Sequence, residues 1–451
     1  DINEDVSKSF LEIMSDSLKK RKTASPVRFV YDRNMPDYLL EKLIGKISDN
    51  KSDHLIQGDR YHNFKDFMKF PNLIGKKHAY KDIEPIWHKA LIPRGSMFKT
   101  IKQQDILLHY PYQSFQHIID LLREASIDPK VRSVKITLYR VANHSSIINA
   151  LINAARNGKN VTVFLELQAR FDEKQNIALS EKLQTVGVKV IANIPGFKVH
   201  SKLLIIRRKE EQKNIYYTYI GTGNFNEDTA ELYADEGLLT AHPVIAHEIR
   251  KVFELFEASF KQFRFRNLIV SPFSTRNFFL KMIEKEIENH ANGKTAWITI
   301  KLNNLADLQL VNKLYKASQA GVKVKIIVRG ICILVPGIPG ISDNIKVVSI
   351  LDKYLEHSRI FTFANNDDPK VYIGSADWMV RNLDTRIEVT CPILDKTLRN
   401  ELLAMLDIQL NDNTKARILD GTFRNKFKEN DEAPVRTQWE TYDYLKTIHN
   451  N

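Results

Sequence analysis

The feature that most constrains the fold of this chain is an α/β pattern that occurs once in each half. The first half carries ITLYR at 136–140 and AARNGKNVTVFLEL at 154–167, and the second half carries ITIKL at 298–302 and ASQAGVKVKIIV at 317–328. Gly158 and Gly321 hold matching positions, 163 residues apart. A strand, a helix and a buried strand in the same order indicate a tandem duplication. The alternative is a pair of unrelated domains that share the common βαβ pattern.

Apolar periodicity predicts the elements around this repeat. The run at 161–167 is almost continuously apolar, as expected for a strand buried on both faces, and 322–328 is predicted to be the second buried strand. Asn157-Gly158 and Ala320-Gly321 are expected to end the preceding helices. Further strands are predicted at 188–192, 198–206 and 215–220, with a long amphipathic helix at 244–263. Upstream, we expect an amphipathic stretch at 7–22, a strand at 27–31 and a helix at 36–47.

The predicted fold class is therefore α/β, with two tandem domains at 91–267 and 268–451 behind a partial, mainly helical segment at 1–90. A chain of 451 residues with 43% hydrophobic residues can form large cores. Two cysteines cannot build a disulfide framework, which favours a reducing compartment. No apolar run reaches the ~18 residues of a membrane span. Because the sequence begins at Asp1 without a methionine, we expect a fragment or a processed product.

The duplication extends to polar residues. His200 and Lys202 lie in KVHSKLLII, and His357 and Arg359 lie in LEHSRIFTF. Because residues two apart on a strand share a face, each histidine should project beside its cation. Each segment is followed by a turn of small residues, GTGN at 221–224 and GSAD at 374–377. Such turns let backbone N–H groups approach an anion.

A histidine beside a cation, present in two copies, suits phosphoryl chemistry. A neutral imidazole can attack phosphorus and hold it covalently, while a second histidine moves protons. Arg140, Arg170 and Arg329 follow strands of the repeat, where ligands bind in sheets of this kind. Guanidinium groups pair with phosphate oxygens, so three of them suit a polyanion. The net charge of +13 agrees with an anionic partner, although a generically basic protein would show it too.

These residues resemble the phospholipase D superfamily and, more closely, the bacterial type 1 polyphosphate kinase family. The resembling stretches are DILLHYPYQSF (105–115), VKITLYRVA (134–142), LELQARFDE (165–173), PGFKVHSKLLII (195–206), IGTGNFNEDTAELYADEGLLT (220–240), IIVRGICILVPGIPGISDNI (326–345) and LEHSRIF (355–361). The resemblance implies two tandem phospholipase D-like domains. It also implies reversible transfer of the terminal phosphate of ATP to inorganic polyphosphate, with Mg²⁺.

The resemblance also implies roles for individual residues. His200 matches the histidine that becomes phosphorylated, and His357 matches the second active-site histidine, which contacts the nucleotide phosphates. Tyr233 and Arg329 match a tyrosine that packs at the ATP site and an arginine that contacts phosphate. Lys202 and the cation beside the second histidine, Arg359, are expected to bind phosphate.

Arg140 and Arg170 match two arginines at the Mg²⁺ position of the family. A guanidinium has no lone pair for a metal, so we expect them to bind the phosphates that hold the ion. The expected partners are ATP or ADP and inorganic polyphosphate, with no nucleic acid. The full-length protein is expected to be a homo-oligomer, cytoplasmic or at most peripheral at the inner membrane.

The sequence departs from the superfamily in ways that bear on function. Phospholipase D enzymes carry an aspartate five residues after the motif lysine, where this chain has Arg207 and Ala364. This difference weakens a hydrolase reading and favours the kinase branch. Only about 90 residues precede the two predicted catalytic domains, and they resemble the end of the family's head domain. We therefore expect this chain to lack the family's N-terminal nucleotide-binding asparagine.

Two other functions remain open at this stage. A phospholipase D-like phosphodiesterase or nuclease could use the same two histidines and transfer the phosphoryl group to water. A scaffold with a degenerate site could bind polyanions without catalysis.

Overall fold

The structure is a computed structural model. It describes residues 10–20, 28–47, 55–61, 63, 64, 67, 70, 71, 73, 75–91, 95–142, 144–167, 169, 172–192, 194, 196–258, 263–422 and 424–449. The chain divides into two compact units, Asp1–Asp82 and Ile83–Asn451. Each unit is described separately below.

The first unit holds short elements. The helices are α1 (Phe10–Lys20) and α2 (Asp37–Ile47), and β1 (Phe29–Asp32) pairs in parallel with β2 (Leu55–Gly58). A 3₁₀ turn, η2, follows at Lys76–His78. The predicted helix at 36–47 is confirmed, and the predicted strand at 27–31 is displaced by one residue at its end. The ends of the predicted stretch at 7–22 lie outside the described residues.

The second unit contains two eight-stranded sheets. The first sheet has the order β15-β10-β9-β8-β4-β5-β6, and β3 also pairs with β10. In chain order its strands are β3 (Ile106–Tyr110), β4 (Val131–Leu138), β5 (Asn160–Leu165), β6 (Lys189–Ile191), β8 (Lys202–Glu210), β9 (Lys213–Gly221), β10 (Tyr233–Thr240) and β15 (Leu355–Glu356). Strands β4, β5 and β6 are parallel to one another, and β8 and β9 are antiparallel to their neighbours. Strand β10 is antiparallel to β3 and β9 but parallel to β15.

The second sheet has the order β11-β19-β17-β16-β12-β13-β14-β20. Its strands are β11 (Ile269–Val270), β12 (Trp297–Leu302), β13 (Lys323–Val328), β14 (Ile345–Ile350), β16 (Ile360–Phe363), β17 (Lys370–Gly374), β19 (Val389–Pro392) and β20 (Ala416–Leu419). Its parallel strands β12, β13 and β14 correspond to β4, β5 and β6. The repeat therefore exists in three dimensions, and the predicted class of two tandem α/β domains is confirmed.

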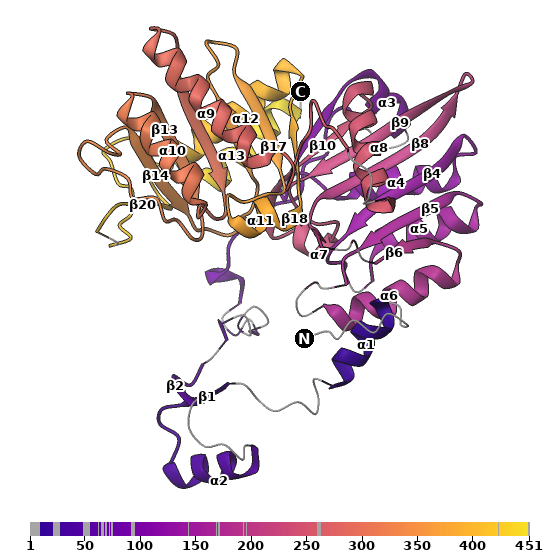
Figure 1. Cartoon of the computed structure of the whole chain (residues 1–451), viewed down its shortest axis with the longest axis horizontal. Helices are drawn as coiled ribbons and strands as arrows, with labels where there is room; N and C mark the ends of the chain where they lie inside the picture. The colour runs from indigo at the N-terminus through magenta and orange to yellow at the C-terminus, as the bar shows by residue number, and fades with distance from the viewer. Residues whose placement is uncertain are drawn as a thin grey trace. The chain divides into compact units, whose positions relative to one another are not determined.

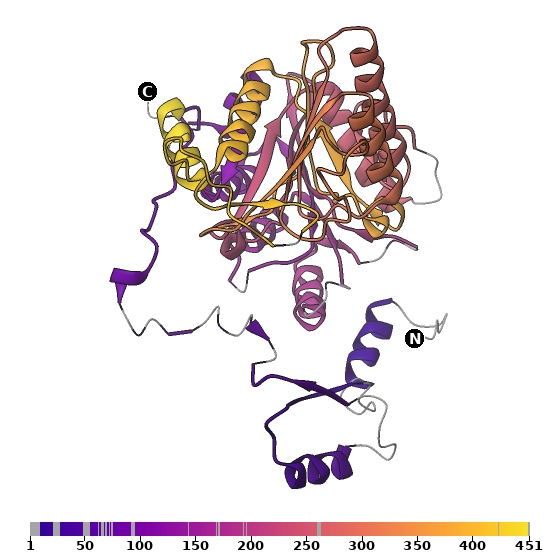
Figure 2. The same ribbon diagram turned by 90° about the vertical axis from the view of Figure 1, so that its left-hand side faces the viewer.

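Helices cover the faces of both sheets (Figures 1 and 2). The first half contributes α3 (Met97–Gln103), α4 (Gln116–Ile127), α5 (Ser146–Arg156), α6 (Glu173–Thr185), α7 (Glu227–Ala230) and α8 (Pro243–Glu257). The second half contributes α9 (Thr275–Ala291), α10 (Leu308–Gln319), α11 (Val380–Asp384), α12 (Lys396–Asn411) and α13 (Thr437–His449). Helix α5 begins where the Ser145 side chain accepts from the Ile148 N–H, and it is followed by Gly158 at φ 74°.

The main hydrophobic core is shared by the two halves. It combines buried residues of both sheets with the apolar faces of α8 and α12, including Phe253, Phe256, Leu402 and Leu406. A second core lies between the second sheet and the helices α9 and α10, and it includes Phe279 and Leu314. Because one core draws on both sheets, the halves fold as one body.

Two predicted elements end differently in the structure. The predicted strand at 198–206 is broken into β7 (Lys198–Val199) and β8, and His200 lies between them. The break arises because β7 leaves the first sheet and pairs with β18 (Arg386–Ile387) of the second half. The predicted helix at 244–263 ends at Glu257.

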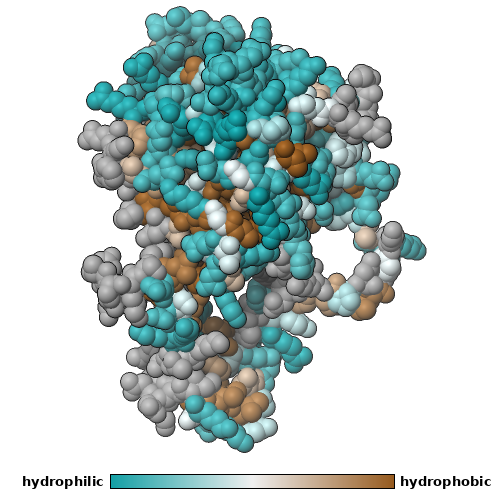
Figure 3. Space-filling model, turned by 90° about the vertical axis from the view of Figure 1, so that its right-hand side faces the viewer, coloured by the Kyte–Doolittle hydropathy of each residue, from teal (hydrophilic) through white to brown (hydrophobic). Residues whose placement is uncertain are grey.

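The face of the molecule in Figure 3 is mostly hydrophilic. Among the residues that the structure describes, no helix has both the length and the apolar character needed to cross a membrane.

Candidate active site

Each of the two motif histidines follows a short strand that pairs with the other half of the body. Strand β7 pairs in parallel with β18, and β15 pairs in parallel with β10. His200 follows β7 directly, and His357 follows β15. The backbone N–H of His200 donates to the carbonyl of Ile387, and that of His357 donates to the carbonyl of Ala234. Both histidines are therefore held where the two halves meet.

A buried carboxylate of the second half orients His200. Its Nδ1 lies 2.9 Å from Oε1 and 3.0 Å from Oε2 of Glu388, which is 1% exposed. Asn382 donates to the same carboxylate at 2.7 Å. A carboxylate can only accept a hydrogen bond, so the proton of a neutral imidazole sits on Nδ1. The Nε2 lone pair is then free to act as a nucleophile.

His357 is oriented in the equivalent way, by a buried carboxylate of the first half. Its Nδ1 lies 2.8 Å from both carboxylate oxygens of Asp235, which belongs to β10 of the first half. Thr222 donates to the same carboxylate at 2.5 Å. Asp235 and Glu388 are 153 residues apart, as are the glycines that begin the two small-residue turns. The duplication therefore includes the carboxylates, and each half supplies the one that serves the other half's histidine.

Burial keeps both imidazoles neutral. It lowers the pKa of His200 to about 3, because desolvation and the charge of Lys202 outweigh the attraction of Glu388. Burial also lowers the pKa of His357, against the opposing effect of Asp235. Each side chain still exposes about one seventh of its surface, 14% for His200 and 15% for His357. A neutral and accessible imidazole is the reactive form for attack on phosphorus.

The two motif cations also lie at this site, although neither shares a strand with its histidine. Lys202 is 2% exposed, and its Nζ donates to the carbonyl of His200. Arg359 lies with Nη1 3.2 Å from Nε2 of His357, and its Nε donates to Asp377 at 3.2 Å. The predicted proximity of each cation to its histidine is therefore found, although a break in the strand lies between them.

An aromatic ring lies beside His200. The ring of Tyr139 meets the imidazole edge-on, with the centroids 5.1 Å apart. The Arg140 guanidinium lies 5.7 Å from the Tyr139 centroid, and its Nε donates to Asp172 at 2.7 Å. The structure therefore brings Arg140 to the His200 side of the site. Arg170, the second arginine predicted at this position, lies outside the described residues.

Tyr233 and Arg329 lie on the His357 side. The ring of Tyr233 is 5.2 Å from the His357 ring. Arg329 donates through Nε to the carbonyl of Glu356 at 2.8 Å and through Nη2 to Asn303 at 2.6 Å. These bonds fix the Arg329 guanidinium next to Glu356, the residue that precedes His357.

The described residues form no cage for a metal ion. No group of three or more histidine, cysteine, aspartate or glutamate side chains has suitable geometry in the part of the chain that the structure describes. The carboxylate near Arg140 belongs to Asp172, which is already paired. Mg²⁺ commonly binds through substrate phosphates, water and one or two carboxylates. The residues that the structure describes here therefore fit an ion that arrives with a phosphate ligand, and they do not form a resident metal site among themselves.

Sequence reasoning missed Asp235, Glu388, Tyr139 and Asp377 as site residues. A signal for the first two was available, because their 153-residue spacing equals that of the two turns. Nothing in the local sequence indicates that these carboxylates cross to the opposite histidine.

The chain is similar throughout to domains and proteins of one family. Residues 1–70 match a family model described as polyphosphate kinase middle domain, residues 96–262 match C-terminal domain 1, and residues 268–438 match C-terminal domain 2. These matches cover both sheets and both histidines.

Curated and solved relatives agree with the domain matches. A polyphosphate kinase of Vibrio vulnificus strain YJ016 is 49% identical over 99% of this chain and 64% of its own length. The Escherichia coli K12 polyphosphate kinase is 48% identical over 99% of this chain and 66% of its own length. The crystal structure of polyphosphate kinase from Porphyromonas gingivalis superposes with a TM-score of 0.85 at 41% identity, over 95% of this chain and 65% of that one. The chain thus spans slightly less than two thirds of these relatives.

Proposed function

The chain belongs to the polyphosphate kinase family, and on this basis we propose that it transfers the terminal phosphate of ATP reversibly to inorganic polyphosphate. We further propose that the transfer passes through a phosphohistidine on His200. The observation that carries this proposal is the Glu388 carboxylate on Nδ1, which leaves Nε2 of a neutral ring as the nucleophile.

The first step forms a bond between Nε2 of His200 and the γ-phosphorus. The bond from that phosphorus to the β,γ-bridging oxygen breaks, and ADP leaves with the electron pair. The phosphorylated ring then carries a positive charge, which the Glu388 carboxylate stabilises. In the second step a terminal oxygen of the polyphosphate attacks the phosphorus, and the electron pair of the N–P bond returns to Nε2.

His357 is proposed to move the proton of the attacking terminal phosphate. Its Nδ1–H is held by Asp235, so its Nε2 can accept a proton as the oxygen attacks and return it in the reverse direction. Lys202, Arg329 and Arg359 would stabilise the phosphoryl oxygens. Tyr233 would pack against the nucleotide.

Mg²⁺ would neutralise charge on the nucleotide phosphates. Arg140 would bind those phosphates, as would Arg170. The domain division that accompanies this proposal is 1–90 for the end of the head domain and 91–267 and 268–451 for the two catalytic domains.

The test is to incubate the chain with γ-³²P-ATP and Mg²⁺ and to map the acid-labile, base-stable label by peptide. We expect label on His200 in the wild type, none in His200→Ala, and discharge to polyphosphate. Discharge to water without nucleotide dependence would instead support the phosphodiesterase. Polyphosphate binding with no label, also after the upstream domains are restored, would support the scaffold.

A further inference from the structure

We propose that the second half carries another nucleotide site, remote from the histidines, in a cavity between α12 and the strands β12 and β13. The cavity has a volume of about 420 Å³. Pockets for small molecules commonly measure ~300–1,000 Å³, so a mononucleotide is an appropriate size.

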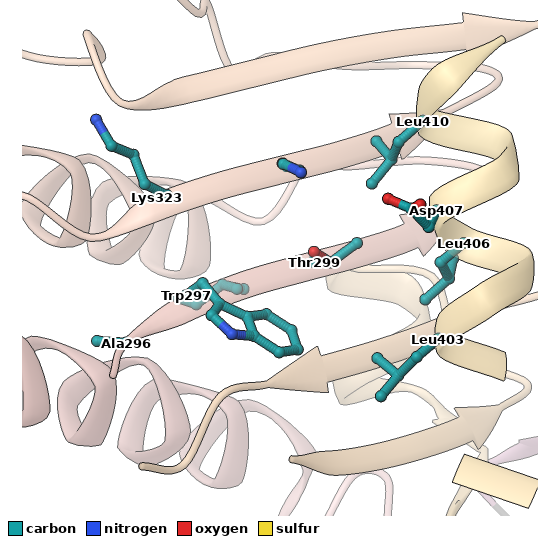
Figure 4. Close-up of a pocket in the computed structure, with 10 residues that line it drawn as sticks. Ala296, Trp297, Thr299, Lys323, Leu403, Leu406, Asp407 and Leu410 are labelled. Carbon is teal, nitrogen blue, oxygen red and sulfur yellow. The ribbon is translucent and has the colours of Figure 1, made fainter. Parts of the chain in front are cut away.

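One wall of the cavity is apolar and contains an aromatic ring. Leu403, Leu406 and Leu410 point from α12 toward the sheet, and Trp297 lies opposite them at the start of β12 (Figure 4). Asp407 points into the same space from the helix. A flat base could stack on the indole and contact the leucines.

Comparison with the first half shows what is unusual about this place. Strand register puts Lys135, Thr162 and Lys189 in one row across β4, β5 and β6. Glu257 at the end of α8 binds both lysines, with Oε–Nζ distances of 2.9 Å to Lys135 and 3.3 Å to Lys189. In the first half, the charges of the two lysines are therefore compensated by a carboxylate of the same half.

The second half has a similar row without the acid. Register puts Thr299, Lys325 and Lys346 side by side across β12, β13 and β14. Helix α12 corresponds to α8 at the 153-residue spacing, which places Leu410 where α8 has Glu257. Within the part of the chain that the structure describes, neither lysine forms an ion pair. Adjacent like charges on a sheet are unfavourable, and a bound anion would relieve them.

A third ammonium group adds to the two. Lys428 donates through Nζ to a carbonyl of α12 at 2.5 Å. Burial lowers the pKa of Lys428, and the charges of Lys346 and Lys325 lower it further, so the three groups interact electrostatically. Asp412 and Glu432 oppose this effect, but Asp412 already accepts from backbone N–H groups of its own loop. Lys323 and Lys325 line the cavity, and Lys346 lies beside Lys325 on the neighbouring strand, so this side of the cavity suits phosphate groups.

The combination favours a nucleotide over a bare phosphate chain. A phosphate chain would use the lysines, gain nothing from Trp297 and be repelled by Asp407. A nucleotide offers a ring for the indole and hydroxyl or amino donors for the carboxylate. The cavity lies at the beginning of β12, whereas His357 lies beyond its end, because β16, which follows the histidine, begins opposite Lys301. Trp297 and Lys301 are four residues apart along β12, which corresponds to about 13 Å.

The test uses the whole chain and reads the site directly. Lysine acylation by an N-hydroxysuccinimide ester is measured peptide by peptide with and without 1 mM ADP. We expect ADP to slow the modification of Lys325 and Lys346 at least fivefold, and tripolyphosphate to require at least a tenfold higher concentration. No protection by ADP, or equal potency of the two probes, would overturn the nucleotide site. Neither lysine belongs to the histidine site, so failure here leaves the proposed transferase testable by His200 labelling.

Two variants separate a site from general surface charge. Leu410→Glu places a carboxylate where the first half has Glu257 and should weaken ADP protection at least tenfold. Asn400→Glu makes the same charge change at an exposed position of α12 and should leave the protection unchanged. Lys346→Gln, read at Lys325, repeats the test without altering the apolar wall. Unchanged protection in both Leu410→Glu and Lys346→Gln would refute the proposal.

Discussion

The two motif histidines, His200 and His357, differ in the cations beside them. Arg359 is bound to Asp377, whereas Lys202 donates to a backbone carbonyl and has Asn224 at the position that corresponds to Asp377. The charge of Lys202 is therefore less neutralised by protein groups than that of Arg359. This asymmetry supports His200 as the acceptor of the phosphoryl group.

Glu388→Gln should slow phosphorylation of His200 by about 10²-fold, the lower end of what a positioned proton or charge partner contributes. The amide keeps the size and the Nδ1 contact but cannot stabilise the positive charge of the phosphorylated ring. Rapid-quench labelling with γ-³²P-ATP measures the rate. Glu254→Gln, which removes an exposed ion pair on α8, serves as the control and should leave it unchanged. A Glu388→Gln rate within threefold of wild type would contradict the role of the carboxylate.

Lys202 should set an alkaline limit on activity. Burial lowers the pKa of Lys202 to about 7, so the free enzyme loses this charge as the pH rises above about 7. We expect kcat/KM for ATP to fall about tenfold per pH unit above that value. Bound phosphate stabilises the ammonium, so kcat should fall only at higher pH. Lys202→Arg should remove the alkaline fall, and a profile with the same limb in both proteins would exclude Lys202 as its source.

At the scale of elements, a buried polar network anchors β15, the strand before His357. Lys301 of β12 lies 2.6 Å from Glu356, and each side chain is 2% exposed. Gln438 of α13 donates to the other carboxylate oxygen at 2.8 Å and to the carbonyl of Tyr354 at 2.9 Å. The C-terminal helix thus stabilises the strand that positions the histidine.

Lys301→Met should lower the free energy of unfolding by about 3–5 kcal/mol, because it leaves the Glu356 carboxylate buried without its partner. The double variant Lys301→Met/Glu356→Gln should recover most of that loss, since no charge is then buried. Urea unfolding followed by circular dichroism gives the three values. If the double variant is as unstable as the single one, the loss comes from packing and not from the uncompensated charge.

Buried histidines should make the second unit less stable in mild acid. Burial lowers the pKa of His88 to about 3 and those of His117 and His449 to about 4. The unfolded chain therefore binds more protons than the folded one below about pH 6.5, and stability falls as the pH decreases from 7 to 5. Each group contributes at most about 2 kcal/mol over this range.

His109 acts in the opposite sense. Burial alone would lower its pKa, but Glu236 and Glu401 outweigh burial and raise it to about 10, so its contribution is fully present below pH 6.5. Thermal unfolding at pH 7 and pH 5 tests the net effect. His449→Gln should reduce the acid-induced fall in melting temperature, whereas His247→Gln, at an exposed position, should not. Equal falls in all three proteins would show that these histidines do not determine it.

At the scale of the whole molecule, the sequence predicts what is local and repeated. The buried strand β5 appears as an apolar run, and the helices before β5 and β13 end at glycine as expected, whereas β13, which is predicted to be buried, in fact exposes Lys323 and Lys325. The duplication also identifies the paired histidines. The exchange of β7 and β15 between halves could not be predicted, because each is two residues long and its partner lies more than 100 residues away. For the same reason the sequence does not show that Asp235 binds His357 or that Glu388 binds His200.

This exchange makes the two halves interdependent. The main core draws on both sheets, and the carboxylate of each histidine comes from the opposite half. Separating the halves would expose apolar surface of α8 and α12 and leave both imidazoles without a partner. The second unit, which contains both halves, should therefore unfold in a single calorimetric transition. A ratio of calorimetric to van't Hoff enthalpy near one would confirm this.

The halves should also fail to act alone. A chain divided at the exposed Arg264 gives 1–264, with His200 but without Glu388, and 265–451, with His357 but without Asp235. Neither piece should be labelled by γ-³²P-ATP, because the first lacks the carboxylate that orients the proposed nucleophile, the second lacks His200 itself, and in both the shared core is incomplete. Co-expression should restore a complex that sediments as one species and carries label on His200. Labelling of the first piece alone would show that Glu388 is not required, and co-purification without label would show that the chain connection itself completes the site.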